Sequence, residues 1–236
     1  RGRRIFGKIV LILLLIIIIL VGIFAYRVYQ NGGGLTGIVT TLVGTDPEKV
    51  KSLPDFYCLL LGKSEAMTDT IMVAKYSPST GDAVLLSIPR DSFVGNNPNT
   101  ATASDKINSK YQISPQRTID AVNDLTGLNI KYYITVDTKA LRDLVDAIGG
   151  VYFDVPIKMD YDDSSQDLYI HLEPGYQLLD GQKAEWLVRF RHNNNGTSYS
   201  YEYGDNDIGR MRTQREFIMA VAQQTLKLEN ITKIND

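Results

Sequence analysis

The sequence predicts an α/β fold in which α-helices sandwich a mixed β-sheet, placed after one N-terminal transmembrane helix. Two patterns predict this class. From residue 56 onward, short runs of apolar and β-branched residues alternate with stretches whose apolar residues recur at helical spacing, which is typical of layered α/β domains. Ahead of them lies an apolar run long enough to cross a bilayer. A composition of 44% hydrophobic and 22% charged residues excludes disordered and collagen-like chains.

The apolar run extends from residue 9 to residue 26 without a charged side chain. At about 1.5 Å per helical residue it spans roughly 27 Å, close to the thickness of a bilayer core. Only Arg27 follows it closely, whereas residues 1–8 are rich in basic side chains. This bias places residues 1–8 in the cytoplasm as a basic tail. We therefore expect a single-pass type II protein of the cell membrane with an extracellular domain. The basic residues of the tail are Arg1, Arg3, Arg4 and Lys8.

A cleaved signal peptide is the alternative interpretation of this segment. The apolar region of a signal peptide usually has about 7–15 residues and ends at a small-x-small cleavage site, which the run Phe24-Ala25-Tyr26-Arg27 does not provide. We therefore expect residues 9–26 to be a retained anchor. Residues 27–54, with glycines at 32–34, are interpreted as a linker, and residues 55–236 as one extracellular domain.

Charge and cysteine usage exclude several classes of function. Without residues 1–26 the chain has more acidic than basic residues, so it is not expected to bind nucleic acid. One cysteine allows no internal disulfide, and two histidines do not provide the usual His/Cys zinc cluster. Cys58 lies in an apolar run and is expected to be a small buried hydrophobe rather than a nucleophile.

The domain begins with three predicted strands. Residues 56–62, 69–76 and 83–88 are short runs rich in apolar and β-branched residues. The Pro- and Gly-containing segment 77–82 reads as a hairpin connection, so at least two of these strands are expected to be antiparallel.

Helices and strands then alternate. Ser114 and Pro115 predict the start of a helix that ends near Gly127. A strand over 130–136 precedes a helix capped by Thr138, and further strands are expected over 151–155 and 168–172. A last long helix starts at Asp207. The residues predicted to face inward are Leu141, Leu144, Val145 and Ile148 in the second helix and Met211, Ile218, Val221, Ala222 and Leu226 in the last.

Four arginines lie beside predicted strand ends and helix starts. Arg90 directly follows the strand over 83–88, where side chains project into a crevice. Arg189 and Arg191 are two apart, which on extended backbone places both on one face with Phe190 on the other. Arg210 lies in the first turn of the last helix, one turn before Gln214, and a helix N-terminus favours anions.

Two interpretations of these arginines stay open. Because they have no dense local acidic partner in the sequence, they suggest a polyphosphate ligand. Alternatively they form surface salt bridges, to which Asp91, Asp205 and Asp207 could contribute for some of them. Asp69 is either the cap of a strand end or a metal ligand, and His192 is expected to be an exposed loop residue rather than a catalyst.

Seven short motifs follow one another along the domain: Asp69-Thr70-Ile71-Met72, Leu86-Ser87-Ile88-Pro89-Arg90-Asp91, Lys106-Ile107-Asn108, Val145-Asp146-Ala147-Ile148-Gly149-Gly150-Val151, Leu179-Asp180-Gly181, Val188-Arg189-Phe190-Arg191-His192, and Asp207-Ile208-Gly209-Arg210 followed by Gln214. In their order and spacing they resemble the LytR-CpsA-Psr family of Gram-positive bacteria over about residues 56–220.

The resemblance implies an activity and a site. Members of this family are phosphotransferases, anchored by one N-terminal helix, that move a glycopolymer such as teichoic acid or capsule polysaccharide from a polyprenyl-pyrophosphate carrier to peptidoglycan. The resemblance also implies a hydrophobic tunnel for the polyprenyl tail and a Mg²⁺ ion held with the help of Asp69. Phosphoryl transfer depends on neutralising the charge of the phosphate oxygens, and the planar guanidinium group of arginine matches the geometry of these oxygens. The implied catalytic residues are Arg90, Arg189, Arg191 and Arg210, and Lys106 and Gln214 are implied to join them in binding the pyrophosphate.

The sequence departs from the family pattern at one place. The family usually has an aspartate shortly after the Leu-Gly of the first strand, where this chain reads Leu61-Gly62-Lys63-Ser64-Glu65. Whether Ser64 or Glu65 replaces this acid stays open. Two other functions also remain alternatives: a lipid pyrophosphatase, and a membrane-anchored regulatory protein that binds polyprenyl phosphate without turnover. A eukaryotic glycoprotein, suggested by the short sequons at Asn195 and Asn230, is a more distant third.

Overall fold

The computed structural model describes residues 23–24, 26–43, 46–64 and 67–225. Two compact units divide the chain: the first takes the residues up to Phe56 together with Lys75–Val84, and the second takes Tyr57–Ala74 and the residues from Leu85 onward. The first unit contains helices α2 (Gly34–Val43) and α3 (Pro47–Lys51), which occupy much of the segment predicted as a linker.

The predicted anchor, residues 9–26, lies almost wholly outside the described residues. Among the residues that are described, none of the helices combines the length and the apolar character needed to cross a bilayer. The anchor therefore stays a prediction from sequence.

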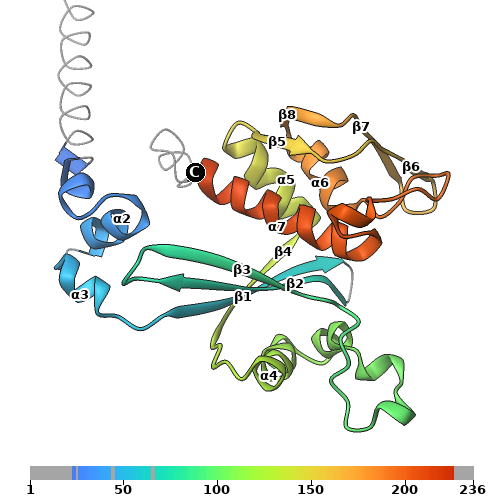
Figure 1. Ribbon diagram of the computed structural model, residues 1–236, viewed down its shortest axis with the longest axis horizontal. Helices are drawn as coiled ribbons and strands as arrows, with labels where there is room; N and C mark the ends of the chain where they lie inside the picture. Colours follow the sequence, from blue (N-terminus) through green and yellow to red (C-terminus); the bar gives the residue numbers. More distant parts are fainter. Residues whose placement is uncertain (1–22, 25, 44–45, 65–66, 226–236) are drawn as a thin grey trace, which may run out of the picture. The chain divides into compact units, whose positions relative to one another are not determined.

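A four-stranded sheet is built from β1 (Phe56–Ser64), β2 (Met67–Ser77), β3 (Asp82–Ile88) and β4 (Tyr132–Asp137), in the order β3-β2-β1-β4 (Figure 1). Strand β4 runs parallel to β1, with Ile134 opposite Leu60. Strands β2 and β3 are neighbours joined by a tight turn, in which Gly81 N–H donates to the Ser77 carbonyl over 2.8 Å, so they run antiparallel. The prediction of a mixed sheet is confirmed.

The strands β1 and β2 present different side chains to their two faces. Leu59 of β1 and Ile71 of β2 are buried in one apolar core, together with residues of the crossover between β3 and β4. That crossover contains short 3₁₀ turns at Pro98–Thr100, Ala103–Asp105 and Ile107–Gln112, followed by α4 (Pro115–Thr126). Since successive side chains of a strand point to opposite faces, Leu60 and Met72 face the other way and line a pocket.

A second core lies around two antiparallel strand pairs and three helices. Strands β5 (Val151–Val155) and β8 (Gly175–Leu179) form one antiparallel pair, and β6 (Met159–Asp163) and β7 (Leu168–Leu172) form another. They pack with α5 (Thr138–Ala147), α6 (Gly181–Arg189) and α7 (Asn206–Thr225). Figure 1 shows these three helices on one side of β1 and β4 and α4 on the other, so helices sandwich this part of the sheet as predicted.

Several elements match the sequence prediction closely. Helix α4 starts after Ser114, whose side chain accepts a hydrogen bond from the Arg117 N–H, and it ends at Gly127 in the left-handed conformation, with φ of 70°. Strands β5 and β7 have the predicted bounds. Local capping and alternation signals are strong at these places, and the fold agrees with them.

Other predictions of the sequence are wrong in detail. Asp137, not Thr138, caps α5, because its carboxylate accepts from the Ala140 N–H at 2.7 Å. Leu144 does not face inward, since 37% of it is exposed. Strands β6 and β8 and helix α6 were not predicted. Arg189 is the last residue of α6 and Phe190, which caps the helix, is extended, so the extended backbone assumed for Arg189 is not present.

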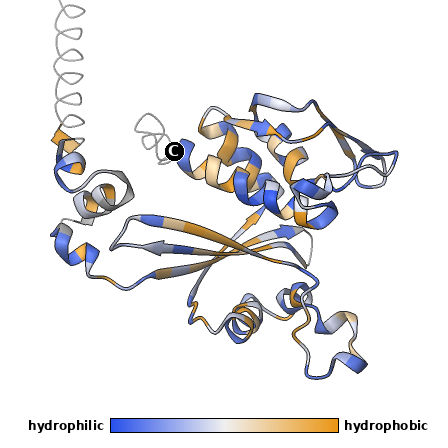
Figure 2. Ribbon diagram, viewed as in Figure 1, coloured by the Kyte–Doolittle hydropathy of each residue, from blue (hydrophilic) through white to orange (hydrophobic). Residues whose placement is uncertain are grey.

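The buried face of α7 also differs from the predicted one. Met211 and Ile218 are only half-buried, Ala222 is exposed, and Leu226 lies outside the described residues, whereas Val221 is buried as predicted. Hydrophilic and hydrophobic residues are mixed along this helix (Figure 2). Its buried residues are Gly209, Arg210, Thr213, Gln214, Phe217 and Val221. An inward face that includes Arg and Gln indicates a functional rather than a purely structural surface.

The first turn of α7 packs closely against Tyr199, and Gly209 makes this possible. A Cβ atom at Gly209 would lie 2.5 Å from Tyr199 Cβ and Cγ, atoms that cannot rotate away. We expect Gly209→Ala to lower the free energy of unfolding by about 1–3 kcal/mol, because such overpacking outweighs the better helix propensity of alanine. Urea denaturation measures this effect.

Ile208→Ala is the matched control for this substitution. Ile208 is the preceding residue of the same turn, but 64% of it is exposed, so its truncation should change the free energy of unfolding by less than about 0.5 kcal/mol. Equal denaturation midpoints for Gly209→Ala and the unmodified chain would contradict the close packing.

Candidate functional site

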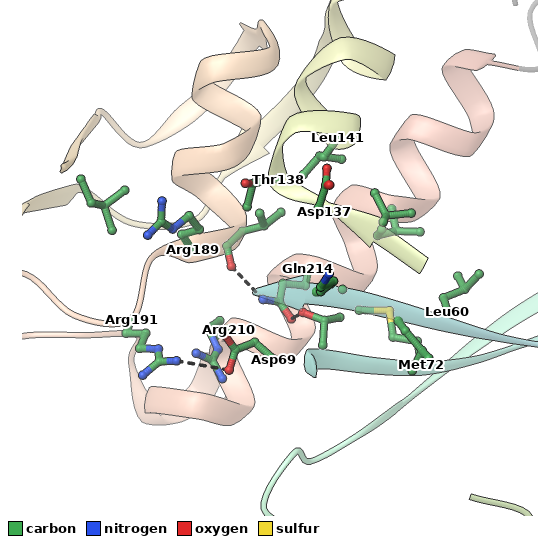
Figure 3. Close-up of a pocket in the computed structure, with 18 of the residues that line it drawn as sticks. Leu60, Asp69, Met72, Asp137, Thr138, Leu141, Arg189, Arg191, Arg210 and Gln214 are labelled. Atoms are coloured by element: carbon green, nitrogen blue, oxygen red, sulfur yellow. Dashed lines mark hydrogen bonds and ion pairs between the residues drawn. The ribbon is translucent and has the colours of Figure 1, made fainter. Parts of the chain in front are cut away.

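A pocket of about 310 Å³ lies between strands β1 and β2 and the helices α5, α6 and α7. One part of its wall is apolar and includes Leu60, Met72 and Leu141. Another part carries charged side chains. In Figure 3 Arg191, Arg210 and Asp69 point toward one another at one end, away from Leu60 and Met72 at the other. The pocket therefore joins a polar end to an apolar end, as a site for an amphipathic ligand requires.

Arg210 is the most buried cation of this site. Its relative exposure is 3%, and it forms an ion pair with Asp207 in the same turn of α7. Its Nε is buried without a hydrogen-bond partner among the described residues. Burial lowers the pKa of the Arg210 guanidinium, which is the physical sign that water has been removed from a cation. An anion beside Arg210 would compensate this cost.

Asp69 lies at the centre of the charged end. Located in β2, it accepts a hydrogen bond on Oδ1 from Nη1 of Arg90, and Nη2 of Arg191 lies 3.7 Å from the same oxygen. Its Oδ2 has no hydrogen bond or ion pair with the described part of the chain. The structure thus brings together residues from three distant segments, as the sequence motifs implied.

Arg90 and Lys106 belong to an adjoining cluster outside the pocket wall. Lys106 Nζ lies 2.7 Å from Asp91, whose pKa is held below its usual range mainly by that hydrogen bond. Arg90 Nε is 3.7 Å from the same carboxylate. The two segments are joined at the backbone, because the Asn108 N–H donates to the Arg90 carbonyl over 3.1 Å. Arg90 reaches the pocket through its contact with Asp69.

Gln214 has partners at both ends of its amide. Its Oε1 accepts from Thr70 Oγ1 at 3.1 Å, and its Nε2 donates to the Val188 carbonyl at 2.7 Å. It is 5% exposed and lines the pocket. The Gln214 side chain of α7 therefore connects β2 to the end of α6. One of its two amide N–H groups remains available to a ligand.

Arg189 lies in the pocket wall at the end of α6. Its Nη1 donates to Glu185 Oε1 at 2.9 Å, and its Nη2 donates to Gln166 Oε1 at 3.4 Å. The local sequence pattern does not indicate the contact with Glu185. A glutamate one turn before an arginine usually forms an exposed pair, and nothing in the local pattern distinguishes a buried one.

Each of the four arginines has an acidic partner in the structure, including acids that the local sequence does not single out. Asp69 lies beside Arg90 and Arg191, Glu185 beside Arg189, and Asp207 beside Arg210. Asp205 contacts none of them; its carboxylate accepts from the Asn206 N–H. These pairs converge on one pocket instead of being scattered over the surface, so the salt bridges are present, and the polyphosphate interpretation stays a prediction.

The other single residues agree with their predicted environment. Cys58 is buried, and burial raises the pKa of its thiol, which argues against a nucleophile. His192 is exposed, as expected for a loop residue, although it also borders the pocket and its ring meets Tyr161 edge to face at 5.2 Å.

The described residues fit a magnesium ion only as a site shared with a phosphate ligand. No cluster of three or more His, Cys, Asp or Glu side chains that could hold a metal occurs among them. Asp69 contributes one carboxylate whose Oδ2 has no protein partner in the described part of the chain. Mg²⁺ is often held by one or two carboxylates plus substrate phosphates and water, which this arrangement permits. Glu65 and the side chain of Ser64 lie outside the described residues.

Comparison with known proteins identifies relatives of this chain. The model of the LytR_cpsA_psr family matches residues 36–236. Biofilm regulatory protein A of Streptococcus mutans is 27% identical over 96% of this chain and 59% of its own length. The polyisoprenyl-teichoic acid–peptidoglycan teichoic acid transferase TagV of Bacillus subtilis is 25% identical over 99% of this chain and 61% of its own length. The chain thus spans about three fifths of these relatives.

A solved structure shares the fold. The LytR-CPS2A-psr family protein YwtF (TagT), with bound octaprenyl pyrophosphate lipid, superposes with a TM-score of 0.55 over 75% of this chain and 70% of that one, at 22% identity. At this identity the likeness shows the fold alone.

Proposed function

Because the chain belongs to the LytR-CpsA-Psr family, we propose that it is a phosphotransferase that moves a glycopolymer, such as teichoic acid, from a polyprenyl-pyrophosphate carrier to peptidoglycan. The observation that carries this proposal is the buried Arg210, whose Nε has no hydrogen-bond partner among the described residues, at the charged end of a pocket whose other end is apolar. The name of TagV, a teichoic acid transferase, and the octaprenyl pyrophosphate bound to TagT support it.

In this proposal the pyrophosphate lies against Arg189, Arg191 and Arg210, and the first isoprene units of the tail lie against Leu60 and Met72. A hydroxyl oxygen of the acceptor attacks the phosphorus that carries the glycopolymer, and its proton passes to solvent or to the leaving group. The bond from this phosphorus to the bridging oxygen breaks, the bridging oxygen keeps the electron pair, and polyprenyl phosphate leaves. The guanidinium groups stabilise the negative charge that develops on the phosphate oxygens, so their role is electrostatic and no protein nucleophile is needed.

We further propose that Asp69 helps to hold Mg²⁺ when the pyrophosphate is bound. The ion would supply additional charge neutralisation at the phosphate oxygens. Support comes from the carboxylate oxygen of Asp69 that has no partner in the described part of the chain, beside the arginines assigned to the phosphates.

A transfer assay with a labelled polyprenyl-pyrophosphate glycan tests the proposed function. With the purified chain, Mg²⁺ and peptidoglycan, label should become attached to peptidoglycan and polyprenyl phosphate should be released. Release of the glycan phosphate into solution, with or without peptidoglycan, would indicate a lipid pyrophosphatase instead. Tight binding of the lipid without release of any product would indicate a regulatory protein without turnover.

We propose that the site lies outside the cell, on a chain anchored in the membrane by residues 9–26. Protease added to intact protoplasts should then degrade the domain, whereas an epitope placed before Arg1 should survive, because the basic residues there favour the cytoplasm. A cytoplasmic protein carried in the same cells is the control for lysis. A full-length soluble protein in the medium would contradict the anchor.

A further inference from the structure

The structure points to Glu185 as the residue that positions Arg189, an inference that rests on the proposed function of the pocket. Glu185 lies in α6 and is only 6% exposed, whereas most glutamates lie at the surface. Its Oε1 accepts from Nη1 of Arg189 at 2.9 Å. Nη1 of Arg142, on α5, lies 3.0 Å from its Oε2. We infer that this carboxylate fixes Arg189 in the orientation that the phosphates require.

Burial distinguishes the Glu185–Arg189 ion pair from the exposed ion pairs within other helices. Two other pairs with the same spacing, Lys139–Asp143 in α5 and Arg212–Glu216 in α7, have side chains that are 43% exposed or more. The Glu185 side chain is 7% exposed and that of Arg189 28%. Water competes with the partners of an exposed ion pair, so such a pair contributes little to stability. Burying a carboxylate costs folding free energy unless cations stay beside it.

Arg142 provides a second cation beside the Glu185 carboxylate. Helices α5 and α6 approach so closely here that a Cβ atom at Gly181 would lie 2.5 Å from the Arg142 carbonyl oxygen. This approach brings the Arg142 guanidinium to Glu185 Oε2, which is otherwise buried without a hydrogen bond among the described residues. Arg142 is not part of the pocket wall. Its charge therefore supports Glu185 rather than the ligand.

The contacts with Glu185 and Gln166 restrict the orientation of the Arg189 guanidinium. An arginine at the end of a helix has many rotamers, but here Glu185 holds Nη1 and Gln166 holds Nη2. A guanidinium has five N–H donors, so others remain for a phosphate. Donors that are already oriented stabilise a transition state better than donors that must first be ordered. Glu185 thus acts through Arg189 and is a positioning residue.

Side-chain NMR of the arginines tests the inference without any activity. In the full chain purified in detergent, the Nε–H signal of Arg189, assigned with Arg189→Lys, should be that of an ordered group. In Glu185→Gln it should become mobile on the ps–ns timescale. Glu185→Asp, which keeps the charge but is one methylene shorter, should have the same effect. Asp143→Asn, which breaks an exposed pair of similar spacing, is the control and should leave Arg189 ordered. A mobile Arg189 in the unmodified chain, or an ordered one in Glu185→Gln, would overturn the inference.

Transfer kinetics then separate positioning from simple loss of structure. Glu185→Gln should lower kcat about tenfold or more while KM for the lipid substrate changes less than about threefold, because the charge of Arg189 remains but its orientation is lost. In an Arg189→Ala background, Glu185→Gln should cause no further loss, since the two residues act as a unit. Equal losses in both backgrounds would assign Glu185 a merely structural role. If Arg189→Ala alone leaves transfer unchanged, the proposed role of the pocket fails instead, and the NMR result still decides the positioning.

Discussion

Replacing Arg210 by alanine is expected to weaken binding of a polyprenyl pyrophosphate analogue by about 10- to 150-fold for each charge-assisted hydrogen bond lost, and to lower transfer at least as much. The effect should be the largest among the arginines because Arg210 is the most buried of them and its Nε has no partner in the described residues. Titration calorimetry of the analogue, together with the transfer assay, measures it.

Two further variants make the result specific to Arg210. Arg210→Lys keeps the charge but lacks the planar fork, so we expect an intermediate loss of affinity. Arg212→Ala lies in the same helix but contacts Glu216 and the ring of Tyr203 instead of the pocket, and it should bind the analogue normally. Wild-type affinity in Arg210→Ala would remove this arginine from the site, provided that its circular dichroism and unfolding transition show a folded chain.

The second large effect is expected for Asp69→Asn, which should abolish Mg²⁺-dependent transfer. Asp69 is a carboxylate of the pocket wall that lies beside Arg191 and keeps one oxygen without a partner among the described residues, and an amide oxygen is a weaker ligand for Mg²⁺. Because one carboxylate binds Mg²⁺ weakly, the ion should bind the free chain poorly and bind together with the pyrophosphate. Calorimetric titration of Mg²⁺ with and without the analogue measures both affinities.

A variant of Glu65 serves as the comparison for Asp69→Asn. Glu65→Gln should have a smaller effect than Asp69→Asn if Glu65 contacts the metal only through water, and no effect if its side chain points to solvent. Full transfer by Asp69→Asn in Mg²⁺, or tight binding of Mg²⁺ to the chain without the analogue, would show that the metal site lies elsewhere or is not needed.

Local signals in the sequence were sufficient to predict many of the helices and strands. The N-cap Ser114, Pro115 and the left-handed Gly127 bound α4 correctly, because caps depend on neighbouring residues alone. The spacing of Arg210 and Gln214 predicted a shared face, and both are buried on it. Helix α6 was missed because nine residues with a buried glutamate among them give a weak helical pattern.

The pairing of charges was beyond the reach of the sequence. Asp69 contacts Arg90 and Arg191 across long separations in the chain, and such contacts exist only once β2, the segment after β3 and the end of α6 have come together. The motifs single out the candidate arginines. Asp207 and Glu185 lie within one helical turn of Arg210 and Arg189, whereas the contacts of Asp69 depend on the tertiary fold.

The carboxylates beside these arginines also bear on selectivity. Asp69 and Asp91 act as tethered competitors, held at high effective concentration against the guanidinium and ammonium groups that would bind a ligand. Chloride or a single phosphate ion, free in solution, has to displace them with few contacts in return. A pyrophosphate with a lipid tail brings several charges and apolar surface at once. A site whose cations are balanced by its own carboxylates would thus select against common small anions and still admit a larger ligand.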